Sequence, residues 1–376
     1  MSNSPRPVPC PPDLRLSAGR ISLRPFDPDA DAERYAQVRT DPESARWGTR
    51  AITGDPVEDT RRVLTDIGAS LATGELWYLA VELDGRLAGR VSLRMDGAGG
   101  AELGFGVHPD ARGNRVATSA SSLLCRHGFD HLGLTVVRWH SFVGNWASRR
   151  VAWRAGFSFD GTERRKLARA GKPLADAWGG TLLPDDVDRP AYLWLAVPDL
   201  ELRGDGPARQ LRAPAERDIQ AIVAAMADPV ACTYLHVPAD YGPPQAEAFL
   251  AEIREEAALG TDLTWVVVDG GDAVLGCLTL DLRSWELGWW GHPAARGRGV
   301  VTSAVRRVAR YAFETLRANR LVARCAESNS ASARVAELAG MRAAGRLRQG
   351  HAHARRSEDT LLFDLVPGDL TRTPPG

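Results

Sequence analysis

The sequence is short of cysteine, of long apolar runs and of net charge, and each shortage excludes a class of protein. Its five cysteines are an odd number and lack the spacing of metal ligands, which indicates reduced thiols in the cytoplasm and predicts no metal site. Lys plus Arg and Asp plus Glu are balanced at 47 each, so no global positive field would attract DNA or an anionic membrane. No apolar run reaches about 18 residues and the N-terminal stretch has no apolar core, so we expect neither a membrane span nor a signal peptide.

A long internal repeat is the main positive feature of the sequence. A shift of 184 residues places Glu102-Leu103-Gly104 on Glu286-Leu287-Gly288. At this shift, 24 of the 60 residues in 102–161 are identical, against about four expected from ordinary composition. The period is far longer than that of a solenoid unit, and a chain of 376 residues has the length of two domains. We therefore predict two domains of one fold in tandem.

The boundary between the domains is predicted in a stretch that prolines interrupt. We place the domains at residues 1–187 and 188–376, with a linker over 185–206. Inside the linker, the apolar segment Tyr192–Val197 is a candidate strand that packs on one half. Each half contains a strand, helices, a three-strand meander, a Gly-rich loop, a helix, a strand, a helix and closing strands. This order predicts an α/β fold with a mixed sheet.

The meander of each half ends in a strand, a His-Pro turn and a Gly-rich basic loop. In the second half this is the stretch from Glu286 to Val300, and a helix from about Val301 to Leu316 follows it. Such a loop offers backbone N–H groups and the positive end of a helix dipole, and Arg296 and Arg298 add full charges. The combination suits a phosphorylated ligand. Alternatively, the stretch is a solvated turn that carries arginines.

A second shared pattern follows the loop. The segments from Asn145 to Gly156 and from Asn329 to Gly340 each begin with Asn-x-x-Ser and end with Gly. Each predicts an Asn N-cap, a helix of about ten residues and a Gly that ends the helix. By itself this pattern indicates only the capping of a helix at both ends.

Together, these patterns resemble the GNAT superfamily of acyl-CoA-dependent N-acyltransferases. The resemblance rests on a strand with Glu, a His-Pro turn, Arg-Gly-x-Gly, a helix, and then Asn-x-x-Ser-x-x-Val before Gly-Phe or Gly-Met. It covers nearly the whole chain, twice, and is closer to the branch that acetylates N-termini of ribosomal proteins and many small amines. It implies two GNAT-like domains, each a central mixed β-sheet flanked by helices with a splayed strand pair. It also implies acetyl-CoA or another acyl-CoA as co-substrate, with the Gly-rich loop around the pyrophosphate and the preceding strand along the pantetheine arm.

Carried over residue by residue, the resemblance implies one set of CoA-binding residues in each half. In the second half these are Gly291, Arg296, Gly297, Arg298, Gly299, Val300, Val301 and Asn329. In the first half they are Val107, Arg112, Gly113, Asn114, Arg115, Val116, Ala117 and Asn145. The first half departs at Arg115, where the motif has Gly; a side chain there would block the ligand or strain the loop by about 1–2 kcal/mol. The second half departs less, with Val301 where a small residue is usual, so we predict that the second half binds the cofactor and that the first has a degenerate loop.

Catalysis requires an amine to lose a proton, attack a thioester and expel a thiolate. Glu286 and Glu102 lie on the strand that should border the thioester, so each is a candidate proton acceptor if burial raises its pKa. Alternatively, each carboxylate pairs with a neighbouring arginine. We predict that catalysis depends on Glu286 more than on Glu102.

The proton donor to the leaving thiolate is less evident. Many family members place a Tyr seven residues after the Asn, but Ala152 and Ala336 occupy these positions. The thiolate would then leave with help from water or from the hydroxyl of Ser332 or Ser148. Backbone N–H groups near Val107 and Gly291 would stabilise the oxyanion.

The resemblance leaves the acceptor open between a peptide or protein N-terminus and a small-molecule amine. The loops Trp47–Pro56 and His236–Pro244 lie where this fold builds its acceptor wall, and they differ between the halves. We expect a cytoplasmic monomer or homodimer. Two alternatives stay open: one half is a non-catalytic scaffold or ligand-binding module, or the donor is an aminoacyl-tRNA, which the neutral net charge disfavours.

Overall fold

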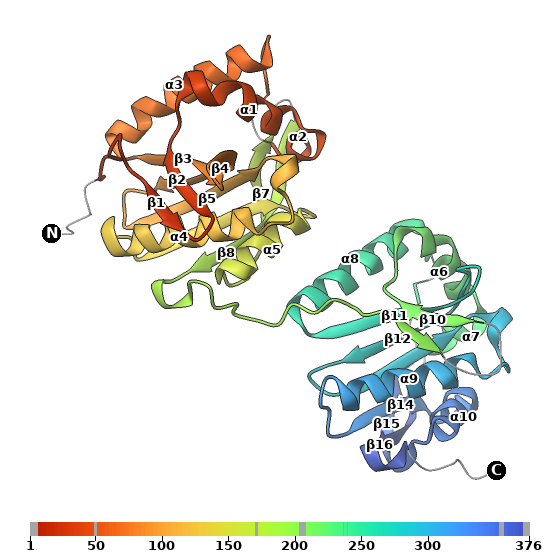
Figure 1. Ribbon diagram of the computed structural model, residues 1–376. Coiled ribbons are helices and arrows are strands. Elements are labelled where there is room, and N and C mark those ends of the chain that lie inside the picture. Colours follow the sequence, from red (N-terminus) through yellow and green to blue (C-terminus); the bar gives the residue numbers. More distant parts are fainter. Residues whose placement is uncertain are drawn as a thin grey trace. The chain divides into compact units, whose positions relative to one another are not determined.

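The chain divides into two compact units, Met1–Tyr192 (unit 1) and Leu193–Gly376 (unit 2), drawn in Figure 1. The structure is a computed structural model. It describes residues 7–48, 51–169, 172–202, 208–235, 237–238, 240–352 and 357–370. Each unit has its own sheet and its own core.

Unit 1 is built on an eight-stranded sheet in the order β1-β2-β3-β4-β5-β6-β8-β7. The strands are β1 (Leu16–Ala18), β2 (Ile21–Pro25), β3 (Leu76–Leu83), β4 (Arg86–Met95), β5 (Gly100–Val107), β6 (Val136–Phe142), β7 (Gly161–Arg169) and β8 (Lys172–Leu182). The helices are α1 (Pro28–Thr40), α2 (Pro42–Trp47), α3 (Pro56–Thr73), α4 (Val116–His131) and α5 (Trp146–Ala155). Neighbouring strands are antiparallel except β5 and β6, which are parallel.

Unit 2 repeats this arrangement, with its sheet in the order β15-β16-β14-β13-β12-β11-β10-β9. Its strands are β9 (Leu200–Leu202), β10 (Arg209–Arg212), β11 (Asp262–Asp269), β12 (Val274–Asp281), β13 (Glu286–Gly291), β14 (Leu321–Ala326), β15 (Arg342–Ala352) and β16 (Ser357–Leu365). Its helices are α6 (Ile219–Met226), α7 (Pro229–Tyr234), α8 (Pro243–Leu259), α9 (Val300–Glu314) and α10 (Ser330–Ala339). The predicted mixed-sheet α/β fold is therefore confirmed in both halves.

Asp-Pro pairs start several of the helices. Asp27, Asp41 and Asp55 accept backbone N–H groups of the first turns of α1, α2 and α3, and a proline follows each of them. The carboxylate satisfies N–H groups that have no partner inside the helix, and proline suits the first helical position because its missing N–H is not needed there. Asp228-Pro229 does the same for α7. The Asp41-Pro42 pair thus ends α1 and begins α2.

Each sheet separates two layers of helices. In unit 1, α1 and α3 cover one face and α4 covers the other (Figure 1). Tyr35, Val38 and Leu64 pack against the first face, while the larger core on the other face contains Trp77 and Trp139, both at most 2% exposed. No helix in the described part of the chain is long and apolar enough to cross a membrane.

The apolar segment Tyr192–Val197, a candidate strand, is not a strand. Residues 192–199 have no regular secondary structure, and β9 begins only at Leu200. The N–H of Leu195 donates to the carbonyl of Ala257 at the end of α8 (3.1 Å), and the indole of Trp265 donates to the carbonyl of Pro198 (2.9 Å). The segment packs on the unit 2 core through Leu195 and Val197, but its hydrogen bonds go to a helix end and a side chain. Pro198 has no backbone N–H, so it also removes one of the donors that a strand would need for pairing.

Candidate active site

The parallel strand pair opens into a V in each unit. In unit 1, β5 and β6 pair only from Gly100↔Val136 to Leu103↔Trp139, although both strands continue. In unit 2, β13 and β14 pair only at Glu286↔Val322. The splayed strand pair that the resemblance implies is therefore present in both units. Beyond the last pair, the facing backbone edges do not bond to each other and can bind a ligand chain.

The open edge of β5 presents backbone donors to the gap. The N–H of His108 donates to the carbonyl of Ala88 on β4 (2.8 Å). Because successive N–H groups along a strand point to opposite edges, those of Val107 and Phe105 point away from β4 and into the gap. In unit 2 the N–H of His292 donates to Leu275 (2.9 Å), which directs the N–H of Gly291 in the same way. The N–H groups of Val107 and Gly291 are the ones predicted to stabilise an oxyanion, and that of Phe105 lies on the same edge.

The Gly-rich loop has the same backbone course in both units despite Arg115. Arg115 takes the left-handed conformation (φ 56°) that Gly299 takes in unit 2 (φ 67°). A Cβ at Gly299 would meet no atom within 4 Å, so this position has room for a side chain. The free-energy cost of Arg115 at this position is therefore only that of its left-handed backbone, about 1–2 kcal/mol. Helix α4 still begins directly after it, at Val116.

The first arginine of each loop binds a carboxylate of the protein. Arg112 pairs with Asp41 and also donates to Ser44 Oγ (3.0 Å), and this guanidinium lowers the pKa of Asp41. Arg296 pairs with Asp228 in the same way. These arginines tie the loop to the N-terminus of α2 or α7. The side chain of Asn114 also turns inward, to the carbonyls of Ala111 (3.4 Å) and Arg112 (3.3 Å).

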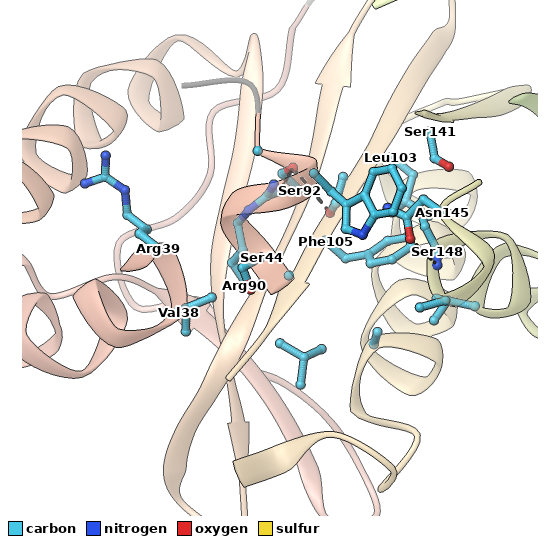
Figure 2. A pocket seen from close by; sticks show the side chains of 18 of the residues that line it. Val38, Arg39, Ser44, Arg90, Ser92, Leu103, Phe105, Ser141, Asn145 and Ser148 are labelled. Atoms are coloured by element: carbon cyan, nitrogen blue, oxygen red, sulfur yellow. Dashed lines mark hydrogen bonds between the residues drawn. The ribbon is translucent and has the colours of Figure 1, made fainter. Parts of the chain in front are cut away.

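A cleft of about 1630 Å³ follows the V in unit 1. It collects most of the predicted first-half residues: Glu102, Val107, Arg112, Gly113, Arg115, Val116, Ala117, Asn145 and Ser148. It is also lined by Trp47, which begins a loop predicted to form the acceptor wall, and by residues that the sequence did not single out, among them Arg90, Ser92, Phe105, His140 and Arg154. Figure 2 shows Arg90 and Ser92 on the side toward Val38 and Arg39, with Asn145 and Ser148 on the opposite side.

Two cations lie together at the loop end of the cleft. Burial and the nearby charges of Arg150 and Arg115 lower the pKa of Arg154, which follows Arg150 by one turn of α5. Arg115 and Arg154 both line the cleft beside the N-terminus of α4, where the helix dipole is positive. This end of the cleft suits a phosphate group. The shift of 184 residues places Leu338 at the position of Arg154.

Glu102 lies in an ion pair rather than in a desolvated pocket. Nδ1 of His140 is 3.4 Å from Oε1 of Glu102, and Nε2 is 2.7 Å from Oε1 of Glu163. The contact with His140 lowers the pKa of Glu102 against the effect of burial, and the same contact raises the pKa of His140. The expectation that burial raises the pKa of Glu102 is therefore wrong, because the histidine stabilises the carboxylate.

In unit 2, an arginine takes the place of that histidine. Arg324 Nε is 3.3 Å from Oε2 of Glu286, and it occupies the position of His140 at the shift of 184 residues. Glu286 thus has the arginine partner that the alternative interpretation foresaw. An arginine cannot give up its proton in a protein, whereas a histidine can.

Asn145 and Ser148 combine a structural role with a place on the cleft wall. Asn145 caps α5 by accepting the N–H of Ser148 (3.1 Å), as Asn329 does for Ser332 (3.1 Å). In unit 1 the indole of Trp139 also donates to Ser148 Oγ (3.0 Å). Because the oxygen already accepts, the hydroxyl hydrogen of Ser148 is directed elsewhere. Ala323 stands where Trp139 would be in unit 2.

Larger side chains stand at the corresponding positions in unit 2. Sheet register places Gly106 opposite Arg90 in unit 1 and Trp290 opposite Cys277 in unit 2. Trp290 packs on the apolar cluster between α6 and α8. A methyl of Val301 lies 3.1 Å from the position that a Cβ of Gly291 would take. Gly297, Arg298 and Gly299 are exposed on the loop, and Val300 is buried.

The comparisons with known proteins agree with this geometry. The model of the acetyltransferase (GNAT) domain matches residues 20–158 and again residues 209–342, which together make up more than half of the chain. The chain belongs to the GNAT acetyltransferase family. The prediction of two GNAT domains in tandem is thereby confirmed. Within the described residues, no group of His, Cys, Asp and Glu side chains could hold a metal ion.

Individual relatives of this GNAT protein match parts of it. The chain is 37% identical over 84 residues to the "Putative ribosomal N-acetyltransferase YdaF" of Bacillus subtilis (strain 168), a match over 22% of the chain that spans about half, 46%, of that relative. Among solved structures, Mycobacterium smegmatis RimJ in complex with CoA-disulfide is 24% identical with a TM-score of 0.42, over 48% of this chain and 91% of that one. A GCN5-related N-acetyltransferase from Brucella melitensis is 24% identical with a TM-score of 0.42, over 50% and 85%.

Proposed function

We propose that the protein transfers the acetyl group of acetyl-CoA to a primary amine, and that the reaction takes place in unit 1. One observation carries the proposal. The cleft of about 1630 Å³ joins the open edge of β5, the loop before α4, the Glu102–His140 pair and the Ser148 hydroxyl. An acyl transfer needs an oxyanion site, a proton acceptor and a stabilised leaving group, and these elements can supply all three.

The chain's own groups fit CoA along this cleft. The N–H groups at the start of α4, with Arg115 and Arg154, would hold the pyrophosphate. Asn145 and the open edge of β5 would border the pantetheine arm. The N–H groups of Phe105 and Val107 would donate to the thioester carbonyl, where they stabilise negative charge as it develops.

The chemistry follows from the same groups. The amine nitrogen bonds to the carbonyl carbon, the C–S bond breaks, and the sulfur leaves as a thiolate. Ser148 donates a hydrogen bond toward that sulfur, since its oxygen is held by Trp139. The Glu102–His140 pair accepts the proton of the amine, directly or through water, when His140 is neutral. Because the pKa of His140 is raised, the rate should rise with pH as the imidazole and the amine deprotonate.

We propose that unit 2 does not catalyse the reaction. Trp290 and Val301 fill the space that Gly106 and Ala117 leave open, and Arg324 replaces the titratable His140. The relative from Bacillus subtilis is named a ribosomal N-acetyltransferase, which supports a peptide or protein amine as one acceptor. A small-molecule amine is the other.

Thiol release from acetyl-CoA by the full chain, measured over peptides and small amines, tests the activity. Glu102→Gln should lower kcat by about 10²–10⁴-fold with little change in CoA affinity, because it removes one member of the proton-accepting pair and keeps its shape. Glu286→Gln is the matched control in unit 2 and should leave turnover unchanged. Loss of turnover in Glu286→Gln alone would move the active site to unit 2.

A further inference from the structure

A guanidinium without a carboxylate partner lies on the wall of the unit 1 cleft. Arg90 and Ser92 point from β4 to the face of the sheet that α1 and α3 cover, and Gly106 and Gly104 oppose them on β5. A Cβ on Gly104 would lie 2.9 Å from Nη1 of Arg90 and 2.8 Å from Oγ of Ser92. The two glycines thus leave room for the guanidinium to lie across β5. Figure 2 shows Arg90 bonded to Ser92 at this place.

The contacts of Arg90 are all to neutral groups. Nη1 donates to Ser92 Oγ (3.3 Å), and the guanidinium lies 5.1 Å from the ring centre of Tyr78. The Tyr78 hydroxyl is 2.5 Å from that of Tyr35. In the part of the chain that the structure describes, no carboxylate lies within ion-pair distance of Arg90. Arg39, on the same side of the cleft, is already neutralised by Asp59 (2.7 Å).

We propose that Arg90 binds a carboxylate of the acceptor, so that unit 1 acetylates amines that carry a carboxylate. This inference rests on the proposed function. Arg90 is partly buried, and a cation that has lost part of its hydration gains more from an anionic partner. The planar fork of a guanidinium matches a carboxylate with two parallel hydrogen bonds. A single positive charge among neutral hydroxyls balances one negative charge, which favours a carboxylate over a doubly charged phosphate ester. The tyrosine pair adds a donor, because one of its two hydroxyl hydrogens is not used between the rings.

The position of Arg90 fits a role in acceptor binding. It pairs in register with Gly106, which directly precedes the Val107 donor at the open edge of β5. An acceptor held there would place one end on Arg90 and could direct its amine to the gap. Unit 2 has buried Cys277 at the equivalent position and Trp290 in place of Gly106, so the proposed anion site belongs to unit 1 alone.

The test compares acids with their amides. Thiol release by the full chain is measured with Ala-Glu-Ala amide against Ala-Gln-Ala amide, and with 4-aminobutyrate against 4-aminobutyramide. In each pair the amine is the same and only the carboxylate changes. We expect kcat/KM to favour the acid by about 10–100-fold in at least one pair, as for a charge-assisted hydrogen bond; the pair that shows it tells a peptide acceptor from a small one.

Variants assign the preference to Arg90. Arg90→Gln should abolish the preference by lowering turnover of the acid much more than turnover of the amide, and circular dichroism checks that the variant is folded. Arg61→Gln is the control and should keep the preference, because Arg61 on α3 pairs with Glu58 and does not line the cleft. Equal kcat/KM for acid and amide in both pairs, or an equal loss for both in Arg90→Gln, would overturn the inference while leaving the acetyltransferase activity standing.

A different outcome separates the two proposals. If none of the four amines is acetylated, calorimetric titration of each into the CoA-saturated protein still tests Arg90. Tighter binding of an acid than of its amide, lost in Arg90→Gln, would support the carboxylate site even though the proposed activity had failed. Equal binding of acid and amide would overturn it.

Discussion

Units 1 and 2 share a loop backbone and differ in what lies beside it. Arg115 and Gly299 take the same left-handed conformation. An Arg–Asp ion pair connects each loop to the N-terminus of a short helix, α2 in unit 1 and α7 in unit 2. The surrounding side chains differ. Trp290 replaces Gly106 and Arg324 replaces His140, so the unit with the better-preserved loop motif has larger side chains on its splayed strands. A loop motif specifies a backbone shape, whereas an acyl-CoA site also needs space beside that shape.

The largest effect is expected when the large side chain of unit 2 is introduced at the equivalent position of unit 1. Gly106→Trp places the side chain of Trp290 into the cleft beside Arg90, and should abolish amine turnover by excluding the acceptor. A Cβ at Gly106 would meet only the side chains of Arg90 and Val38, at 3.7 Å or more, and circular dichroism checks that the variant keeps its fold. Trp290→Gly is the matched change in unit 2. It should lower stability by about 2 kcal/mol without changing turnover; an active Gly106→Trp protein would break the comparison.

The next effect comes from exchanging the partners of the two glutamates. His140→Arg gives Glu102 the permanent cation that Glu286 has, and should lower kcat by about 10²-fold because the pair can no longer take up a proton. The part of the pH–rate profile that reflects titration of His140 should also disappear, which leaves only the part due to deprotonation of the amine. Arg324→His in unit 2 is the control. Full activity in His140→Arg would show that the amine loses its proton without the pair.

A smaller effect is expected at the leaving group. Ser148→Ala removes the hydroxyl that Trp139 orients, and should lower kcat by about tenfold with an unchanged KM for acetyl-CoA, as expected for one hydrogen bond made to the departing thiolate. The loss should be smaller with a thioester whose thiol is more acidic. Ser332→Ala provides the comparison in unit 2. A rise in KM without loss of kcat would make Ser148 a binding residue.

The smallest effect concerns stability rather than turnover. Burial, with the charges of Asp262 and Glu252, raises the pKa of Glu256 in unit 2 from 4.5 to about 7. A carboxyl whose folded pKa is raised binds its proton more tightly in the folded state, so unit 2 should lose stability as pH rises from about 4.5 to 7. Glu256→Gln should remove this loss and raise the Tm of unit 2 by a few degrees, about 2–4 °C, at pH 8 and not at pH 4. An equal rise in Tm at pH 4 and pH 8 would show that the effect comes from packing and not from the charge of Glu256.

Local features of both units could be predicted from the sequence. The helix after the second loop was expected at about Val301–Leu316 and spans Val300–Glu314, and Asn145 and Asn329 cap their helices as expected. Caps, turns and apolar periodicity involve residues close in the chain, so their signals are visible in short windows. The tandem repeat was visible because two copies can be aligned with each other.

Contacts between distant residues could not be predicted. Arg112 meets Asp41 across 71 positions, so a residue predicted to bind CoA also anchors the loop. His140 meets Glu102 only because parallel strands bring them together, and this contact reverses the expected direction of the carboxylate's pKa shift. The predicted preference for the second half as the cofactor site stays a prediction, and the cleft in unit 1 now favours the opposite choice.

The central claim is that CoA binds in unit 1, and calorimetric titration with CoA tests it most directly. Arg115→Glu and Gly299→Glu place the same negative charge at equivalent, exposed loop positions with room for the side chain. We expect one CoA to bind per wild-type chain. In Arg115→Glu, repulsion of the pyrophosphate should weaken CoA binding by at least about tenfold. In Gly299→Glu, the CoA affinity should be unchanged. Weakened binding in Gly299→Glu with unchanged affinity in Arg115→Glu would place the site in unit 2 and contradict the account.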